Sequence, residues 1–233
     1  MKAYKHLFFD LDGTLWDFAK NSEATLHDIY IMHSLQNSHN NGFAQFFETY
    51  NRINHGLWEQ YRQGTLEKEK LSVLRFSLTL EAFGIKNPDL AEQISVEYIT
   101  QSPRKTLLFP HAIQTLQTLR KNYQLHIITN GFIEVQLNKI SYSGIKDYIV
   151  HMITSEEAGC LKPCNAIFEY ACRKTGATPE ASLMIGDDYS IDIEGAAQAG
   201  MDTVFFNPLG NESGIHANYE IKSLSELTGI LKQ

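Results

Sequence analysis

The sequence has few cysteines, only Cys160, Cys164 and Cys172 in 233 residues. A small, odd number of cysteines does not build a disulfide framework. No fourth ligand follows them at the spacing of a zinc finger, and the nine histidines form no H-x-H or H-E-x-x-H pattern. We therefore predict reduced thiols on or near a helix and no zinc site.

Long hydrophobic runs are also missing. No stretch approaches the roughly 20 apolar residues that cross a bilayer. The apolar part of the N-terminal MKAYKHLFFDLDG is too short for a signal peptide, and acidic residues follow it at once. These two absences predict a soluble cytoplasmic protein that does not enter a membrane.

Positive charge is in deficit, because 20 lysines and arginines stand against 27 acidic residues, a formal net charge of −7. Proteins that bind nucleic acid usually present a basic face, so a nucleic-acid polymer is not an expected partner. A small anionic substrate remains compatible with this charge, because a metal ion or a local cluster of donors can hold it. The hydrophobic content of 43% is enough for a sizeable core.

Short apolar runs are the first positive signal in the sequence. They are rich in Ile, Leu, Val and Phe, as buried parallel strands are, and occupy residues 6–9, 124–129, 148–154, 182–187 and 202–206. Amphipathic helical patterns precede or separate the last four runs, and three of these patterns end in a glycine, at Gly144, Gly176 and Gly200. This alternation predicts an α/β protein with a doubly wound parallel sheet and right-handed crossovers.

Residues 17–105 interrupt this alternation. They contain no convincing strand, and their apolar residues recur with a period near 3.6 over residues 22–35, 44–64, 66–84 and 87–99. A polar, turn-prone break, QNSHNNG, separates the first two patterns at residues 36–42. We therefore predict an α/β core of residues 1–16 and 106–233, with an inserted all-helical domain of residues 17–105.

Reactive side chains follow four of the predicted strands. Ligands of open parallel sheets bind beyond the carboxyl ends of the strands, so these side chains are expected to meet. They are Asp10 and Asp12 after the first strand, Thr129, Asn130 and Gly131 after the second, Lys162 after the third, and Asp187, Asp188 and Asp192 after the fourth.

Asp10 and Asp12 stand two residues apart, which in extended backbone places both side chains on one side. Two carboxylates this close repel one another unless a cation or a shared proton lies between them. A hard divalent cation such as Mg²⁺ prefers oxygen ligands, and Asp187 could complete its shell. The backbone of the Gly13 turn and the charge of Lys162 would then suit a phosphoryl group.

Four short motifs occur in a fixed order: DLDGT, ITNG, KP and GDDYSID. In that order and over the whole chain they resemble the motifs of the haloacid dehalogenase-like (HAD) hydrolase superfamily. The resemblance implies a Rossmann-like core, and it implies that the helical insertion is a cap domain of the C1 type.

The resemblance also implies a role for each core residue. Asp10 would be the nucleophile that becomes an aspartyl phosphate, and Asp12 would be the general acid and then the base. Thr129 would hydrogen-bond the phosphoryl group, together with the backbone of Asn130 and Gly131. These roles define a phosphoric monoester hydrolase.

The remaining motif residues would serve the charge balance of the site. Lys162 would neutralise the phosphoryl group and orient Asp10. Asp10, the backbone carbonyl of Asp12 and Asp187 would bind Mg²⁺. Asp192 would support Lys162 or a metal-bound water, and Asp188 is assigned only a supporting place.

A narrower resemblance rests on ITNGF, on SEE-x-G-x-x-KP, and on N-x-x-LW-x-x-Y-x-x-G in the helical insertion. These are similar to the YjjG/YfnB-type nucleotidases, which implies pyrimidine (deoxy)nucleoside monophosphates as substrates. Asn54, Trp58 and Tyr61 fall on one helical face. Trp58 and Tyr61 could stack on a base or could pack in the core of the cap, and both readings stay open.

Other functions remain as alternatives. The same residues could serve a phosphatase of another small phosphomonoester such as a sugar phosphate, or a phosphomutase. A haloacid dehalogenase lacks the second aspartate, so Asp12 argues against it. A non-enzymatic phosphorylated receiver is shorter and has no helical insertion. A monomer or a homodimer is expected.

Overall fold

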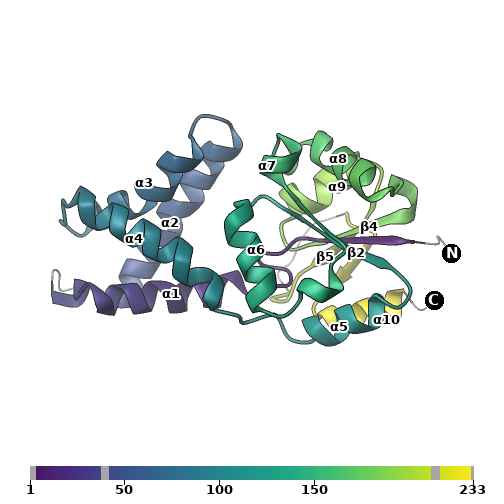
Figure 1. Ribbon diagram of the computed structural model, residues 1–233, viewed down its shortest axis with the longest axis horizontal. Coiled ribbons are helices and arrows are strands. Elements are labelled where there is room, and N and C mark those ends of the chain that lie inside the picture. The colour runs from purple at the N-terminus through teal and green to yellow at the C-terminus, as the bar shows by residue number, and fades with distance from the viewer. Residues whose placement is uncertain (1–3, 38–41, 211–215, 232–233) are drawn as a thin grey trace. The chain divides into compact units, whose positions relative to one another are not determined.

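The computed structural model describes residues 4–37, 42–210 and 216–231. The chain divides into two compact units, one of Met1–Phe18 and Thr106–Gln233 and one of Ala19–Lys105 (Figure 1). The predicted limits of the insertion were residues 17 and 105. Most of the predicted polar break, residues 38–41, lies outside the described residues.

A six-stranded parallel sheet forms the centre of the first unit. In chain order its strands are β1 (His6–Phe9), β2 (Gln124–Thr129), β3 (His151–Thr154), β4 (Ser182–Gly186), β5 (Asp202–Phe206) and β6 (Tyr219–Ile221). Their spatial order is β3-β2-β1-β4-β5-β6. The chain builds outward on one side of β1 and then on the other, which confirms the doubly wound α/β fold and puts the topological switch beside β1.

Two strand predictions need correction. The third strand begins at His151, three residues later than predicted, because Lys146–Tyr148 is a 3-10 turn in which Tyr148 N donates to Ile145 O. The sixth strand was missed, because two of its three residues are exposed and it carries no apolar run.

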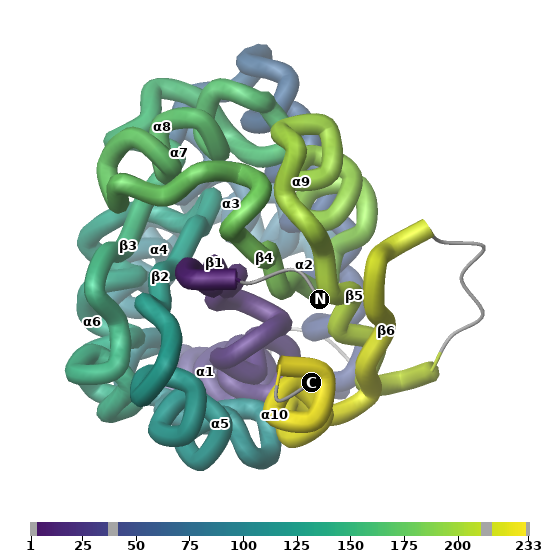
Figure 2. Tube along the Cα trace, turned by 90° about the vertical axis from the view of Figure 1, so that its right-hand side faces the viewer, coloured from purple at the N-terminus to yellow at the C-terminus, as the bar shows by residue number. Residues whose placement is uncertain are grey.

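Helices cover both faces of the sheet (Figure 2). One face packs on α5 (Ala112–Leu119), α6 (Ile133–Tyr142) and α10 (Leu227–Ile230), and the other on α7 (Ser155–Ala158), α8 (Asn165–Thr175) and α9 (Glu194–Gln198). Alternate residues of β1 divide between them, since Leu7 and Phe9 join the first core and Phe8 the second. The short α7 and α10 were not predicted.

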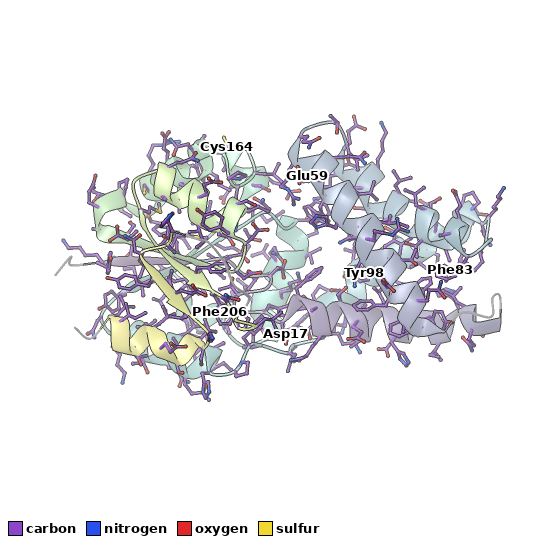
Figure 3. The ribbon with its side chains drawn as sticks, turned by 180° about the vertical axis from the view of Figure 1, so that it is seen from behind. Asp17, Glu59, Phe83, Tyr98, Cys164 and Phe206 are labelled. Carbon is purple, nitrogen blue, oxygen red and sulfur yellow. The ribbon has the colours of Figure 1, made fainter. Side chains whose placement is uncertain are left out.

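The second unit is helical and has a core of its own. It contains α1 (Phe18–Met32), α2 (Phe43–Arg62), α3 (Lys68–Ala82) and α4 (Pro88–Gln101). Buried aromatic residues from these helices, among them Tyr50, Phe76 and the Phe83 and Tyr98 labelled in Figure 3, form its centre. The first helix begins and ends earlier than predicted, and Ser34 just beyond it has a φ of 51°.

None of the helices in the described part of the chain is both long enough and apolar enough to cross a membrane. The longest of them, α2, has 20 residues but contains several charged side chains.

Three histidines lie side by side on one face of the sheet. The ring of His126 stacks on those of His6 and His151, with centroids 5.4 and 5.6 Å away, and His6 Nδ1 lies 3.1 Å from His126 Nε2. His126 is fully buried, and its Nδ1 has no partner among the described residues. Burial, with the neighbouring His6 and His151, lowers the pKa of His126 to about 3.

This burial predicts a loss of stability in acid that depends on His126. Above pH 6.5 His126 is neutral in both states, but between 6.5 and about 3 only the unfolded chain binds the proton. Each pH unit in that window costs up to about 1.4 kcal/mol of unfolding free energy. We expect His126→Phe to flatten the fall in unfolding free energy between pH 7 and pH 5, measured by urea unfolding. The exposed His55, replaced in the same way, should keep the wild-type slope, and an unchanged slope in His126→Phe would contradict the prediction.

Candidate active site

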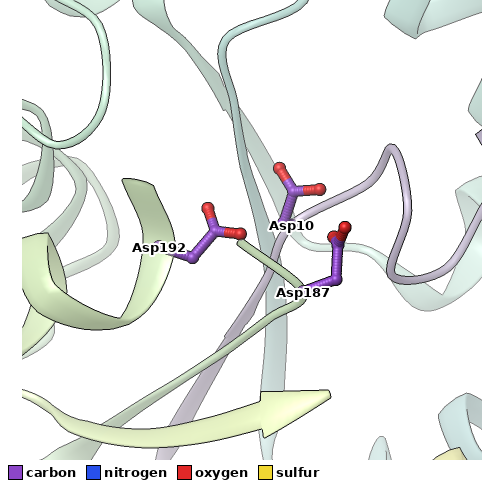
Figure 4. Close-up of side chains that lie close together, drawn as sticks. All are labelled: Asp10, Asp187 and Asp192. Atoms are coloured by element: carbon purple, nitrogen blue, oxygen red, sulfur yellow. The ribbon is translucent and has the colours of Figure 1, made fainter. Parts of the chain in front are cut away.

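Three carboxylates meet where β1 and β4 end (Figure 4). Asp10 follows β1, and its backbone N donates to Ile185 O of β4 at 2.8 Å. Asp187 directly follows β4, and Asp192 lies in the following helical turn, η5 (Tyr189–Ile193). One carboxylate oxygen from each lies within 4.8 Å of the others. The predicted Asp10 and Asp187 are thus brought together with Asp192, which was predicted only as a support.

Lys162 joins two of these acids. Its Nζ donates to Asp10 Oδ1 at 2.5 Å and to Asp192 Oδ1 at 2.6 Å, and the side chain is 2% exposed. Burial disfavours the ammonium, but the charges of Asp10 and Asp192 outweigh it and hold the pKa of Lys162 above its usual value. The site therefore contains a fixed, buried positive charge.

One ammonium does not balance three carboxylates. Burial, with the charge of Asp192, raises the pKa of Asp187 to about 7, and burial raises the pKa of Asp10 well above its usual value despite Lys162. Both shifts report that a further positive charge would stabilise the cluster. An all-oxygen donor set suits a hard cation, so the residues fit Mg²⁺, which Asp10 and Asp187 would hold beside Asp192.

Asp12 lies apart from the three-carboxylate cluster. Its Oδ1 accepts from Lys139 Nζ at 2.6 Å and its Oδ2 from Gln136 Nε2 at 2.9 Å, both on α6. Each oxygen of the Asp12 carboxylate thus has one partner on α6, and the predicted metal contact of Asp12 would come from its backbone carbonyl. Lys139 and Gln136 were not predicted as site residues, because a lysine and a glutamine in the middle of a helix are ordinarily solvated.

Thr129 is buried at the end of β2. Its Oγ1 accepts from Gln136 Nε2 at 2.6 Å and from Gly131 N at 3.1 Å. These bonds use the hydroxyl oxygen as an acceptor, so its hydrogen is left to donate to a ligand.

The two residues after Thr129 have structural tasks. Asn130 pairs twice with the backbone of Lys162, since Lys162 N donates to Asn130 Oδ1 at 2.7 Å and Asn130 Nδ2 donates to Lys162 O at 3.0 Å. At Gly131 a Cβ atom would collide with the side chain of Gln136. The predicted phosphate contacts of Asn130 and Gly131 would therefore come from their backbone.

The turn after β1 holds Asp187 in place. Thr14 Oγ1 donates to Asp187 Oδ1 at 2.7 Å. Gly13 has a φ of 98°, and a Cβ atom there would collide with the carboxylate of Asp187. Only glycine therefore lets this turn approach the second strand end so closely.

Asp188 supports Asp192. Its carboxylate caps η5 by accepting from Ile191 N at 3.0 Å, and its backbone N donates to Asp192 Oδ2 at 3.2 Å. Because Lys162 holds the other oxygen of Asp192, both oxygens of that carboxylate are fixed.

In the helical unit, the three α2 residues that were predicted to share one helical face differ in burial. Asn54 is buried, and its Oδ1 has no partner among the described residues. Trp58 and Tyr61 are half-buried and meet edge to face, with ring centroids 5.5 Å apart. Neither ring belongs to the buried core of the helical unit, and a contact of either with substrate stays a prediction.

The three cysteines are free thiols on or near α8. Burial raises the pKa of Cys172, and of Cys160 with a contribution from Cys164, to about 11. Neutral thiols therefore dominate at physiological pH for these two residues.

Several known hydrolases are similar to this chain in sequence. A family model described as haloacid dehalogenase-like hydrolase matches residues 4–200. Pyrimidine 5'-nucleotidase YjjG of Escherichia coli is 31% identical over 97% of this chain and 96% of its own. A glyceraldehyde 3-phosphate phosphatase of Methanothermobacter thermautotrophicus is 33% identical over 87% and 85%.

A solved structure is similar over its full length. The magnesium-bound crystal structure of the HAD-hydrolase YfnB from Bacillus subtilis has a TM-score of 0.90, 27% identity and complete coverage of both chains. With the family model covering most of the sequence, this chain belongs to the haloacid dehalogenase-like hydrolase family and is an enzyme of that family.

Proposed function

We propose that the protein is a Mg²⁺-dependent phosphatase that acts through an aspartyl phosphate, with pyrimidine (deoxy)nucleoside 5'-monophosphates as substrates. The observation that carries the proposal is the pairing of buried Asp10 with buried Lys162 at 2.5 Å, at the topological switch of the sheet. A carboxylate held beside a fixed cation is placed to attack a phosphoryl group and to share its charge with that cation.

The reaction needs two displacements at phosphorus. A carboxylate oxygen of Asp10 forms a bond to phosphorus as the bond to the leaving oxygen breaks, and Asp12 donates a proton to that oxygen. Water then attacks the phosphorus of the aspartyl phosphate and gives a proton to Asp12. Inorganic phosphate leaves, and Asp10 is restored.

Other residues stabilise the phosphoryl group during both steps. Lys162 would neutralise its oxygens, and the free hydrogen of the Thr129 hydroxyl would donate to one of them. Mg²⁺, held by Asp10 and Asp187, would supply the second positive charge. We assign to the helical unit the part of a cap that selects the substrate, with Trp58 and Tyr61 as candidates for stacking on a base.

The nucleotide substrate is supported by the similarity to YjjG, whose name states that activity. A second candidate function is a sugar-phosphate phosphatase, favoured by the similarity to the Methanothermobacter glyceraldehyde 3-phosphate phosphatase. Both candidates use the same core residues and differ in the substrate that the helical unit would select.

A substrate panel distinguishes the two candidates. We expect kcat/KM for dUMP, dTMP and UMP to exceed that for sugar phosphates at fixed Mg²⁺, measured by phosphate release. Chelation with EDTA should abolish the activity and added Mg²⁺ should restore it, because without the cation three clustered carboxylates would face one ammonium. Sugar phosphates ranking first would favour the second candidate, and full activity in EDTA would contradict the role of Mg²⁺.

A further inference from the structure

Helix α6 carries two buried polar side chains, Lys139 and Gln136, that have no role in the proposed mechanism. Lys139 and Gln136 are both buried, with exposed fractions of 4% and 0%. They lie one turn apart on α6 and both contact the carboxylate of Asp12. Burying a lysine or a glutamine costs free energy unless its polar atoms are paired, so the burial of both residues beside Asp12 needs an explanation.

Lys139 is committed to a single acid. Its Nζ donates to Asp12 Oδ1 at 2.6 Å, and this is its one ion pair among the described residues. The rings of Trp16 and Phe18 lie over the ammonium, with centroids 4.1 and 5.7 Å from Nζ. These cation–π contacts offset part of the cost of burial and hold the ammonium against Asp12.

Gln136 fixes the second oxygen and connects it to another site residue. Its Nε2 donates to Asp12 Oδ2 at 2.9 Å and to Thr129 Oγ1 at 2.6 Å. Its Oε1 is buried without a partner among the described residues, so the side chain is held by its amide nitrogen alone. One nitrogen thereby joins the proposed proton donor to the proposed phosphoryl-binding hydroxyl.

With one donor on each oxygen, the plane of the Asp12 carboxylate is fixed. Asp12 directly precedes the turn at residues 13–15 and its side chain is 25% exposed, so without these donors it could adopt other rotamers. Proton transfer in a transition state requires the acid within hydrogen-bond reach of the leaving oxygen.

We propose that Lys139 and Gln136 are positioning residues that hold Asp12 for proton transfer to the leaving group. The inference rests on the proposed function, because it assumes that Asp12 is the acid. It gives α6 a positioning role, and neither of the two residues belongs to any of the four sequence motifs.

The test compares two leaving groups in Lys139→Met. p-Nitrophenolate departs with little need of a proton, whereas the 5'-oxygen of a nucleoside monophosphate needs one. The measured quantity is kcat/KM, which covers the steps up to departure of the leaving group. We expect a fall of about 10²- to 10³-fold for the nucleotide and of less than about 10-fold for p-nitrophenyl phosphate, the range of general acid catalysis.

Three further variants make the result specific. Lys139→Met should cost nothing more on the nucleotide in an Asp12→Asn background, because both changes remove the same step. Lys139→Arg should recover part of the loss, since it restores a cation. Lys174→Met removes another ion-paired lysine, whose partner is Glu157, and should match the wild type on both substrates.

The outcomes separate this inference from the proposed function. Equal losses on both substrates, or additive losses in the double variant, would overturn the positioning role. A wild-type protein that hydrolyses neither ester would refute the proposed function instead. If Lys139→Met does not fold, as judged by circular dichroism, Lys139→Arg and Gln136→Met decide, because each should still give a loss that is larger for the nucleotide.

Discussion

Asp10→Asn should reduce phosphatase activity by about 10⁴-fold or more, because the amide cannot act as the nucleophile. The change keeps the shape of the side chain and removes one of three clustered carboxylates. We therefore expect the fold to be retained. Steady-state hydrolysis of p-nitrophenyl phosphate in Mg²⁺ measures the loss.

A covalent readout makes this prediction specific. Acid-quenched wild-type protein should carry one phosphoryl group on Asp10 by peptide mass spectrometry, and Asp10→Asn should carry none. Asp147→Asn, an exposed aspartate outside the site, is the matched control and should behave as the wild type. Full activity in Asp10→Asn would refute the mechanism.

Lys162→Met should lower both activity and stability. The change removes the only ammonium that contacts Asp10 and Asp192 among the described residues, and both carboxylates are buried. Breaking a buried ion pair by removing one partner costs about 3–5 kcal/mol of unfolding free energy. Loss of a cation at the phosphoryl group should reduce kcat by about 10²- to 10³-fold. Urea unfolding and steady-state kinetics measure the two effects.

A second substitution tests the cause of the instability. If uncompensated charge is responsible, adding Asp192→Asn to Lys162→Met should recover part of the lost unfolding free energy. Lys174→Met, which breaks a partly exposed pair with Glu157, should cost about 1 kcal/mol or less. Wild-type stability in Lys162→Met would show that the buried pair does not hold the fold.

Much of the architecture follows from local pattern. Strands β1 and β2 occupy the predicted residues, because each is a short, mostly apolar run followed by polar or turn residues. Gly176 ends α8 with a φ of 70°, as its place after the helical pattern predicted. Elements without such a pattern were missed, among them the three-residue β6 and the four-residue helices α7 and α10.

Asp10, Asp187 and Lys162 could be predicted as neighbours from the sequence, because each follows a predicted parallel strand. Parallel strands end at one edge of the sheet, so residues that follow them are collected there whatever their distance in sequence. The side chains of Lys139 and Gln136 could not be placed in this way. They stand in the middle of a helix, where a lysine or glutamine is ordinarily solvated.

The sequence by itself determined the doubly wound sheet, the helical insertion and the set of reactive residues at the strand ends, because these depend on periodicity and on short motifs. The tertiary structure alone decided which carboxylate has which partner. Asp10 and Asp192 share Lys162, whereas Asp12 turns to Lys139 and Gln136 on α6. That division depends on how α6 packs beside the turn after β1, and contacts between residues more than 120 positions apart leave no periodic signal in the sequence.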